Sequence, residues 1–300
     1  MSTVNPKTAG SETRRGPGGL AHLLPRTADL TRRQFAQISA LARSVCGLNL
    51  HSRKRELVKA RLHKRLRQLQ LDSFDEYLDY LRSDASADEL VAMLDALVTN
   101  VTSFFRHVEQ FEYLVGVVLP RKIAGAAESG RRLRIWSAGC STGEEAYSIA
   151  IAVAETVPHI GAWDVAILAT ALSTGVLRRA SDGVYTAERL RPIPLHLRGK
   201  YFTRVQARPK ELYRVRENIR PLVHFRRLNL MGLWPMRGTF DVIFCRNVMI
   251  YFDKATQDRL IERLREVLAP GGTVFVGHSE SLTNPDRGFR YVRPAIYEKP

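Results

Sequence analysis

The stretch I-W-S-A-G-C-S-T-G-E-E-A-Y-S-I-A, from Ile135 to Ala150, decides the fold. It begins inside a short apolar run, L-R-I-W, which is typical of a buried parallel strand. A loop with Gly139 and Gly143 follows, and a helix is predicted over residues 144–157. Strand, glycine loop and helix in this order indicate an α/β sheet that binds a ligand at the carboxyl end of its first strand.

The same alternation continues toward the C-terminus. Further strands are predicted at residues 165–168, 241–245 and 273–276, and further helices at 174–181 and 256–268, the last ended by Pro270-Gly271-Gly272. Tyr201 to Phe225 breaks the alternation with β-prone segments around a polar turn, which predicts a small antiparallel insertion that includes Leu222–Phe225. We therefore expect an α/β, Rossmann-like sheet with helices on both faces and a β-subdomain at about 200–226.

The N-terminal third has a different pattern. Residues 1–25 have few large apolar side chains and many Gly, Pro, Ser and Thr, so we expect a flexible tail. Helical spacing begins at about Thr31 and stops at Gly47, and a second helix is predicted from Ser52 to Leu69. We expect an all-helical domain at residues 26–98, a linker at 99–120 and the α/β domain at 121–300.

Charge is distributed unevenly along the chain. The formal net charge is +16, which favours an acidic partner: nucleic acid, a membrane surface or an acidic protein. Residues 50–70 hold eight Lys or Arg and one Glu, whereas residues 71–120 hold ten acids and two Arg. The basic helix is either a solvated charged face or a surface that contacts the partner.

The amino-acid composition of the chain limits the cellular compartments in which we expect it. The chain is 45% apolar and 25% charged, which excludes wholesale disorder. Cys46, Cys140 and Cys245 lack C-x-x-C spacing, which argues against a disulfide framework or a structural zinc site and fits a reducing compartment. No run approaches the roughly 20 apolar residues that span a bilayer, and the N-terminus lacks the apolar core of a signal peptide. We expect a cytoplasmic protein without membrane insertion.

The glycine loop restricts the ligand. Its G-x-x-x-G spacing is neither the G-x-G-x-x-G dinucleotide fingerprint nor a Walker loop, so a phosphate role is not favoured. Glu144 and Glu145 suit a helix N-terminus, and one of them is a candidate to receive a cationic group. S-adenosylmethionine, a nucleoside with an ammonium group and no phosphate, fits these features better than NAD or ATP.

Five motifs follow one another along the chain. T-N-V-T-S-F-F-R occupies residues 99–106, the glycine-loop stretch 135–150, L-N-L 228–230, F-D-V-I-F-C-R-N-V-M-I-Y-F-D 240–253 and G-H-S-E-S-L 277–282. Together they resemble the chemotaxis receptor glutamate methyltransferases, the CheR family, from about residue 28 to the C-terminus.

The resemblance implies a fold, a reaction and a set of residues. Relatives join a helical domain to a Rossmann-like class I methyltransferase domain with a β-subdomain, and use S-adenosylmethionine to esterify glutamates on the cytoplasmic helical bundle of chemoreceptors. By motif, Arg106 and Tyr251 are expected at the transferred methyl group. The residues expected around the cofactor are Asn100, Thr102, Arg106, Gly139, Gly143, Glu145, Ala171, Asn229, Leu230, Arg246 and Asn247. Docking on the receptor is expected through Arg53, Arg55, Lys59, Lys64 and Arg67.

Ester formation needs little chemistry from the protein. A glutamate with an ordinary pKa of about 4.3 is already an anion at neutral pH, so no general base is needed, and no metal is expected. The protein must still align the two reactants and exclude water, and these effects lower the activation barrier by about 7–11 kcal/mol in favourable cases. Arg106 suits alignment because a guanidinium holds a carboxylate in a planar fork. Its alternative is a surface ion pair with Glu109 or Glu112.

Other residues in the motifs have simpler interpretations. Tyr251 either faces the ligand or packs at a strand end, and the strand-end position favours the ligand. His278 is expected to be structural or at the edge of the pocket. Cys140, Cys245 and the pair Phe104-Phe105 are expected to be packing residues, with the phenylalanines in the core or the cofactor wall.

The chain departs from the family after the second predicted strand. The family reads A-[S/T]-D-I-[D/S]-T, and this chain reads A-T-A-L-S-T at 169–174, so Ala171 replaces the acid that binds ribose hydroxyls. Losing a hydrogen bond to a charged group costs about 1.5–3 kcal/mol, so we expect weaker cofactor binding. Neither Asp164 nor Asp182 is an obvious substitute. Three explanations stay open: an introduced Asp-to-Ala change, a natural enzyme with another ribose acceptor, or a homologue without turnover.

The leading hypothesis is an S-adenosylmethionine-dependent protein-glutamate O-methyltransferase impaired by Ala171. The alternative is a receptor-binding homologue that does not methylate. A nucleic-acid methyltransferase is a distant third, because the N-P-P-Y type of loop of amino-group methyltransferases is absent, and no nucleic-acid partner is expected. We expect a monomer. The β-subdomain is a candidate site for a receptor's C-terminal peptide, although the turn from Val205 to Glu211 lacks the glycine of a tight turn.

Overall fold

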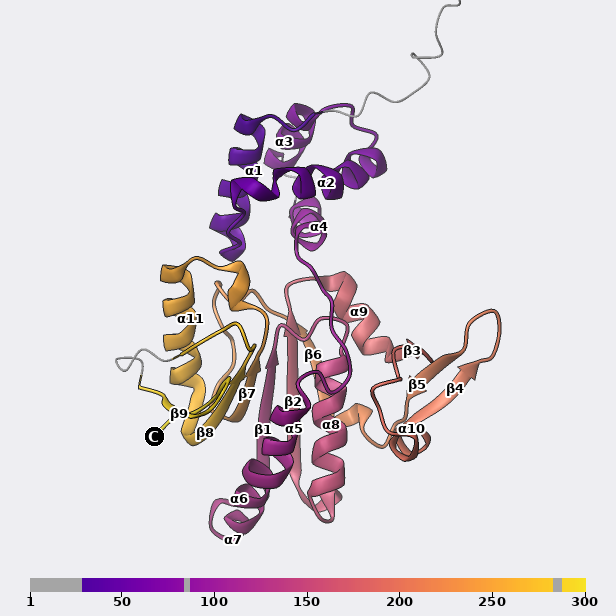
Figure 1. The fold of residues 1–300 in the computed structure, drawn as a ribbon, viewed down its shortest axis with the longest axis vertical. Helices are drawn as coiled ribbons and strands as arrows, with labels where there is room; N and C mark the ends of the chain where they lie inside the picture. The colour runs from indigo at the N-terminus through magenta and orange to yellow at the C-terminus, as the bar shows by residue number, and fades with distance from the viewer. Residues whose placement is uncertain (1–28, 84–86, 283–287) are drawn as a thin grey trace, which may run out of the picture.

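The computed structural model describes residues 29–83, 87–282 and 288–300. A helical domain sits over one edge of an α/β domain, and a small β-subdomain extends to the side (Figure 1). The tail predicted at residues 1–25 lies outside the described residues.

The helical domain forms as its capping residues and apolar stripes predict. Thr31 and Gln34 form a capping box at the start of the first helix, and Gly47 ends it with a left-handed φ of 76°. In the second helix Val58, Leu62 and Leu66 are buried, and Leu69 at its end is partly buried. The helices are α1 (Arg32–Cys46), α2 (Arg55–Leu69, after a short 3-10 turn), α3 (Phe74–Arg82) and α4 (Ala87–Leu97).

The main sheet of the α/β domain has seven strands in the order β6-β2-β1-β7-β8-β10-β9. All pairs from β6 to β8 are parallel, and β10 pairs antiparallel with both β8 and β9. The carboxyl ends of the parallel strands therefore meet at one edge, beneath the helical domain. The strands are β1 (Arg132–Ala138), β2 (Asp164–Ala171), β6 (Val223–Arg227), β7 (Phe240–Cys245), β8 (Leu268–Val276), β9 (Arg290–Arg293) and β10 (Ile296–Glu298).

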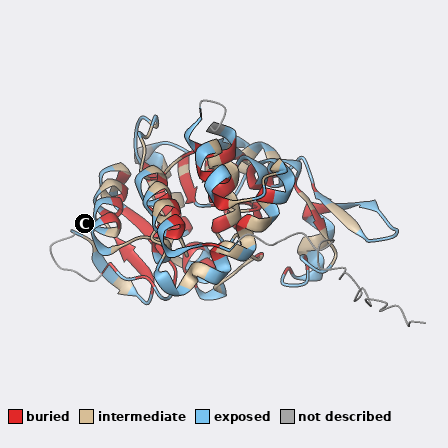
Figure 2. Ribbon diagram, turned by 90° about the horizontal axis from the view of Figure 1, so that it is seen from above, coloured by how far each residue is buried: buried red, intermediate tan, exposed pale blue. Residues whose placement is uncertain are grey.

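Helices cover both faces of this sheet, as predicted. Ile135 of β1 packs in one apolar cluster with the buried face of α8 (Glu144–Thr156), and its neighbour Trp136 packs in a second cluster with α11 (Lys254–Val267). Alternate side chains of each strand thus enter opposite cores. Figure 2 shows buried residues concentrated in the strands and on the inward sides of these helices.

The linker is shorter than the predicted range of 99–120. Irregular backbone ends at His107, and a helical run begins with α5 (Val108–Tyr113). It continues through a π-helical turn into α6 (Leu119–Ala124) and a last turn, α7 (Ala126–Ser129). Phe111, Leu114 and Leu119 pack against the sheet, so this run is part of the α/β domain.

The predicted antiparallel insertion exists, but its extent differs. Its three strands have the order β3-β5-β4, where β3 is Val184–Thr186, β4 is Phe202–Gln206 and β5 is Leu212–Val215. The short helices α9 (Thr174–Asp182) and α10 (Leu195–Tyr201) flank it. Leu222–Phe225 does not belong to it: residues 223–227 form β6, parallel to β2 in the main sheet. Composition marks a segment as β-prone without fixing its partner, which explains the error.

Pro270-Gly271-Gly272 also has a different place from the prediction. Helix α11 ends at Val267, and the three residues lie within β8. The register between β7 and β8 shifts there, because Phe240 faces Leu268 whereas Val242 faces Thr273. The extra residues form an irregularity in the strand.

Candidate active site

A cavity of about 280 Å³ opens where the parallel strands end beneath the helical domain. The loops after β1, β2, β6 and β7 all contribute to its wall, and so do α4 and residues 99–106. This is the edge at which open α/β sheets bind their ligands. Of the residues predicted from sequence, the cavity brings together Asn100, Thr102, Arg106, Gly139, Glu145, Ala171, Asn229, Leu230, Arg246, Asn247 and Tyr251.

The two glycines of the first loop have different tasks. Gly139 lines the cavity with a φ of +88°, and a Cβ there would lie 2.5 Å from Val248 Cγ2. Gly143 does not line the cavity. It begins α8 with a φ of +94°, and a Cβ there would lie 2.9 Å from the Cβ of Ala180. Its role in the described structure is close packing, which only glycine permits at this φ.

A buried ion pair connects three walls of the cavity. Glu145 accepts hydrogen bonds from Ser137 Oγ at 2.6 Å and from Arg246 Nε at 2.6 Å. The guanidinium of Arg246 also donates to the Arg106 carbonyl and to Gln110 Oε1. Arg246, expected as a pocket residue, therefore fixes the glycine loop and the start of α5 relative to β7, while Glu145 still faces the cavity.

Arg106 and Tyr251 both line the cavity. The Arg106 side chain is half-buried and donates to the Val101 carbonyl at 3.2 Å. Among the described residues, no carboxylate lies within ion-pair distance of it, so the surface pair with Glu109 or Glu112 does not form. The Tyr251 hydroxyl donates to the Thr99 carbonyl at 3.0 Å.

Asn229 and Asn247 of the cavity wall differ in whether their side-chain oxygens have hydrogen-bond partners. Asn229 is held by the protein: its Nδ2 donates to the Val45 carbonyl at 2.6 Å, and its Oδ1 accepts from Met231 N at 3.0 Å. Asn247 has a left-handed φ of 58°, and its buried Oδ1 has no hydrogen-bond partner within the described structure. An unpartnered buried acceptor in a cavity indicates a ligand that donates a hydrogen bond.

Glu280 organises the loop after β7 and was missed by sequence reasoning. Its buried carboxylate accepts four backbone N–H groups: those of Asn247 at 2.9 Å, Met249 at 2.7 Å, Ile250 at 3.3 Å and Gly277 at 2.5 Å. These hydrogen bonds fix the backbone of the loop that carries Arg246, Asn247 and Tyr251. The G-H-S-E motif was the only signal in the sequence, and it gave no role to its glutamate.

Asp95 of α4 and Ser173 at the start of α9 also line the cavity and were not predicted. Ser173 Oγ donates to Asp95 Oδ2 and accepts from Val176 N at 3.2 Å. Burial raises the pKa of the Asp95 carboxyl, which the hydrogen bond from Ser173 and the positive charge of Arg227 partly offset. Asp95 stands in an otherwise apolar helix segment, L-D-A-L, and only the fold brings it to the cavity.

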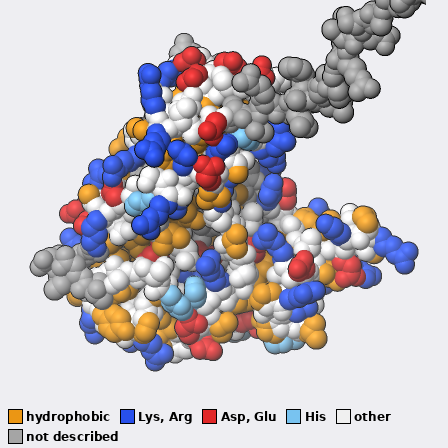
Figure 3. Space-filling model, turned by 45° about the horizontal axis from the view of Figure 1, so that its top comes forward, with side chains coloured by type: hydrophobic (Ala, Val, Ile, Leu, Met, Phe, Trp, Pro, Cys, Tyr) orange, Lys and Arg blue, Asp and Glu red, His pale blue; other side chains and the backbone are white. Residues whose placement is uncertain are grey.

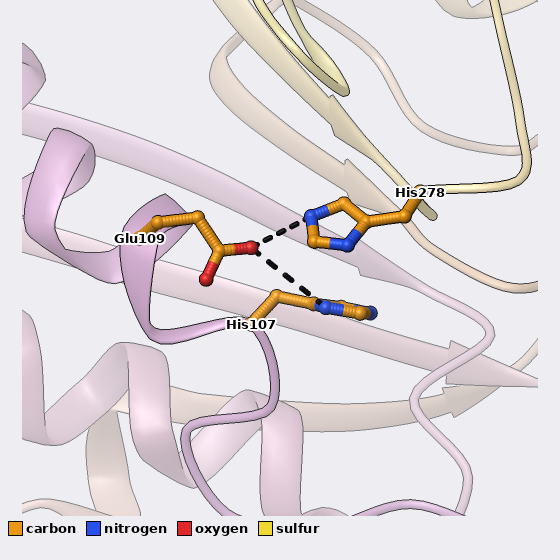
Figure 4. Close-up of side chains that lie close together, drawn as sticks. All are labelled: His107, Glu109 and His278. Carbon is orange, nitrogen blue, oxygen red and sulfur yellow. Dashed lines mark ion pairs between the residues drawn. The ribbon is translucent and has the colours of Figure 1, made fainter.

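Two histidines and a glutamate lie together: His107, Glu109 and His278 (Figure 4). Glu109 Oε1 is 2.6 Å from His278 Nε2 and 3.8 Å from His107 Nδ1. Burial, and then the charges of His278 and the nearby arginines, lower the pKa of His107. Glu109 therefore contacts His278 closely and His107 only at long range, and the Nε2 atom of His107 is buried without a partner among the described residues.

The cysteines and phenylalanines of the motifs are packing residues. Cys140 and Cys245 are buried, and burial raises the pKa of both thiols, which disfavours a thiolate nucleophile. Phe104 packs edge-on against Tyr185 and Phe202 in the core.

Helix α2 and the 3-10 turn before it carry the five residues expected to dock on a receptor, with Arg53 in the turn and the other four in the helix. Lys59 Nζ lies 2.7 Å from Asp29 Oδ1, and Arg55 lies 3.3 Å from Glu56. The other three are exposed, with no carboxylate partner in the part of the chain that the structure describes: Arg53, Lys64 and Arg67. Figure 3 shows Lys and Arg side chains across one face of the helical domain.

Comparisons with known proteins identify the family of this chain. Residues 100–297 match the family model for the CheR methyltransferase SAM binding domain, and residues 33–98 match that for the CheR methyltransferase all-alpha domain. The chain belongs to the CheR methyltransferase family. Chemotaxis protein methyltransferase 2 of Pseudomonas aeruginosa is 42% identical over 270 residues, which cover 89% of this chain and 93% of that CheR protein. The chemotaxis protein methyltransferase of Escherichia coli is 37% identical over 89% of this chain and 91% of its own.

Membership in the CheR family confirms the predicted class I methyltransferase fold and S-adenosylmethionine as the cofactor. The cavity fits this cofactor, since the Glu145 carboxylate and the unpartnered Asn247 Oδ1 are both acceptors for an ammonium or amino group. Within the described residues, no helix combines the length and the hydropathy of a membrane span.

Proposed function

We propose that this CheR protein transfers the methyl group of S-adenosylmethionine to glutamate carboxylates on the cytoplasmic helices of chemoreceptors. The observation that carries the proposal is the cavity at the strand ends, whose wall includes both Arg106 and Tyr251 next to the Glu145 loop. The names of the relatives, chemotaxis protein methyltransferases, support a chemotaxis receptor as the substrate.

The residues around the cavity bind, orient and exclude water. The bound cofactor supplies an electrophilic sulfonium methyl group. The substrate glutamate arrives ionised, so the protein need not remove a proton. Arg106 has no carboxylate partner in the described structure, and its guanidinium is available to hold both oxygens of the substrate. Tyr251, held by Thr99, closes the mouth beside the reacting atoms.

We assign the other cavity residues to cofactor binding. Glu145 and Asn247 offer acceptors to amino groups, and Gly139 lets the backbone approach the ligand closely. The remaining contacts are assigned to Asn100, Thr102, Ala171, Asn229, Leu230 and Arg246.

Receptor recognition is proposed for two surfaces. The exposed basic side chains of α2 are complementary to acidic receptor helices. Strand β4 is an edge of the small sheet, where a receptor's C-terminal peptide can add as a further strand. We further propose that the protein acts as a monomer in the cytoplasm, where receptor signalling domains lie.

A methyl-transfer assay tests the proposal. The protein is incubated with S-adenosylmethionine tritiated at the methyl group and with receptor cytoplasmic domains, and the label is then treated with mild base. Base-labile label on the receptor is expected, because methyl esters hydrolyse whereas methylamines do not. Label that resists base, or label found on nucleic acid and not on the receptor, would contradict the proposal.

A further inference from the structure

We propose that Asp95 of the helical domain supplies the ribose-binding carboxylate that Ala171 does not provide. The inference deepens the proposed cofactor site and rests on it. It identifies the ligand group as the vicinal hydroxyls of the ribose, bound by an acid from a different domain.

The positions of Ala171 and Asp95 carry the first step. Ala171 is the last residue of β2, the strand end where Rossmann-like proteins place the acid that binds ribose. Its side chain ends at Cβ and offers no acceptor. Asp95 lines the same cavity, and so do Leu94 of α4 and Val98 just beyond its end, so the C-terminal part of α4 contributes to the cavity wall together with Ala171.

Ser173 connects Asp95 to the end of β2. It lies two residues beyond Ala171, caps α9, and donates its hydroxyl to Asp95 Oδ2. The Asp95 carboxylate is therefore hydrogen-bonded directly to the loop that follows β2, through the hydroxyl of Ser173. An acid at position 95 thus reaches the region that an acid at position 171 serves in other Rossmann-like sites.

The state of the carboxylate supports a ligand role. Ser173 engages Oδ2, and no donor within the described parts of the chain reaches Oδ1. No described Lys or Arg forms an ion pair with Asp95, although Arg227 and Arg65 lie near enough to influence its titration. A half-buried carboxylate with one free oxygen, facing a cavity, is suited to accept hydrogen bonds from a diol.

A purely structural role makes a different prediction. If Asp95 only joins α4 to α9 through Ser173, an asparagine would keep that bond through its amide oxygen and the cofactor would bind as before. If Asp95 also accepts from ribose, asparagine has one acceptor oxygen for two tasks, and affinity falls.

A double-mutant cycle distinguishes the two roles. Calorimetric titration with S-adenosylhomocysteine is carried out on the full chain and on Asp95→Asn, Ala171→Asp and the double variant. We expect Asp95→Asn to raise Kd by about 10- to 100-fold, Ala171→Asp alone to change it by less than about threefold, and Ala171→Asp to restore affinity in the Asp95→Asn background. Wild-type affinity in Asp95→Asn, or an equal gain from Ala171→Asp in both backgrounds, would overturn the inference.

Two controls sharpen the cycle. Asp88→Asn, an exposed acid on the same helix, is expected to leave Kd unchanged. An S-adenosylhomocysteine analogue without the two ribose hydroxyls is expected to bind wild type and Asp95→Asn equally, and a remaining difference would count against ribose contact. Failure of the wild-type chain to bind S-adenosylhomocysteine would contradict the proposed function itself, whereas unchanged binding by Asp95→Asn contradicts only the role of Asp95.

Discussion

At the scale of single residues, the surroundings of Arg106 decide its task. Its carbonyl accepts from the buried Arg246, which fixes the backbone, while its own guanidinium donates to the carbonyl of Val101. Glu109, one of the two acids that could have neutralised it, is directed to His278 instead. The positive charge therefore remains available to an incoming carboxylate.

Replacing Arg106 by lysine tests this availability. Arg106→Lys keeps the charge but loses the planar fork, so kcat/KM for the receptor is expected to fall by about 10- to 100-fold. Initial rates of methyl transfer measure it, and Arg178→Lys, an exposed arginine on α9 outside the cavity and the proposed receptor surfaces, is the matched control. Equal rates for Arg106→Lys and wild type would show that bidentate binding is not used.

The ionised Asp95 carboxylate is predicted to strengthen cofactor binding but to lower the stability of the fold at neutral pH. Its pKa is raised in the folded state from an ordinary 3.8, mainly by burial. The folded protein therefore binds this proton more tightly than the unfolded chain, so ionisation of Asp95 destabilises the fold at neutral pH, and the cost disappears as the pH falls below about 4. Asp95→Asn is expected to raise Tm at pH 7 and to leave Tm unchanged near pH 3.5. Calorimetry checks both values, and a lower Tm at pH 7 would contradict the assignment.

The sequence predicted those cavity-lining residues that lie inside continuous motifs, such as Arg106, Glu145 and Tyr251. It did not predict residues whose role depends on approach between distant segments. Asp95 is 78 positions from Ser173, and Glu280 is 33 positions from Asn247. No local pattern encodes such a contact, because the spacing depends on the complete fold.

At the scale of elements, the loop after β7 depends on the carboxylate behind it. Four N–H groups point to Glu280, and Gly277 leaves no room for a side chain, since a Cβ there would lie 2.7 Å from Glu280 Oε2. Asn247 is held with a positive φ, a conformation that non-glycine residues adopt only under constraint. The position of Tyr251 at the cavity mouth follows from this anchoring.

Glu280→Gln is expected to displace the loop. In the glutamine variant an NH2 group faces backbone N–H donors that a carboxylate oxygen faces in the wild type. We expect the loop to shift and kcat to fall by about 10- to 100-fold, because a displacement of reacting groups by about 1 Å has an effect of this size. Glu298→Gln is the matched control, because Glu298 is also buried and bonded to several donors but lies away from the cavity. Thermal melting and kcat are measured for both variants. A Glu298→Gln variant that loses as much kcat as Glu280→Gln would show that general destabilisation explains the loss.

The spacing of apolar residues predicted the location of most helices and strands. It did not predict with which strand a given β segment pairs. The segment Val223–Arg227 has the composition of the nearby hairpin, yet it pairs with β2 because that strand's edge remained open to a parallel partner. The helix from Val108 onward has few sequence signals of its own. It is stabilised by packing Phe111 and Leu114 against the sheet.

At the scale of the whole molecule, the two domains share one cavity and are bonded across it. Asn49 N donates to the Tyr251 carbonyl at 2.8 Å, and Leu48 pairs with Phe252 in an isolated bridge. Helix α2 is part of the same connection, because Arg61 of α2 donates to Thr99 Oγ1 at 2.8 Å, and the Thr99 carbonyl accepts from the Tyr251 hydroxyl. Thr99 therefore links α2 to Tyr251.

Charge reversal on α2 tests whether this helix brings the receptor to the cavity. The variant carries glutamate at three exposed basic positions: Arg53, in the turn before α2, and Lys64 and Arg67, on α2 itself. We expect KM for the receptor to rise by about tenfold or more at low salt, and the salt dependence of the rate to flatten, because steering between opposite charges is lost. Kd for S-adenosylhomocysteine should stay unchanged, since none of the three lines the cavity.

The control for net charge is a second triple reversal at exposed arginines that lie away from α2: Arg131, Arg132 and Arg178. Both triples change the net charge by the same amount, so a long-range effect of total charge would raise KM equally in both. A local docking surface raises KM only for the α2 variant, because a Debye length of about 8–10 Å confines each exposed charge to its own surroundings. Equal KM values would remove α2 from receptor recognition and leave the net positive charge as the only attraction.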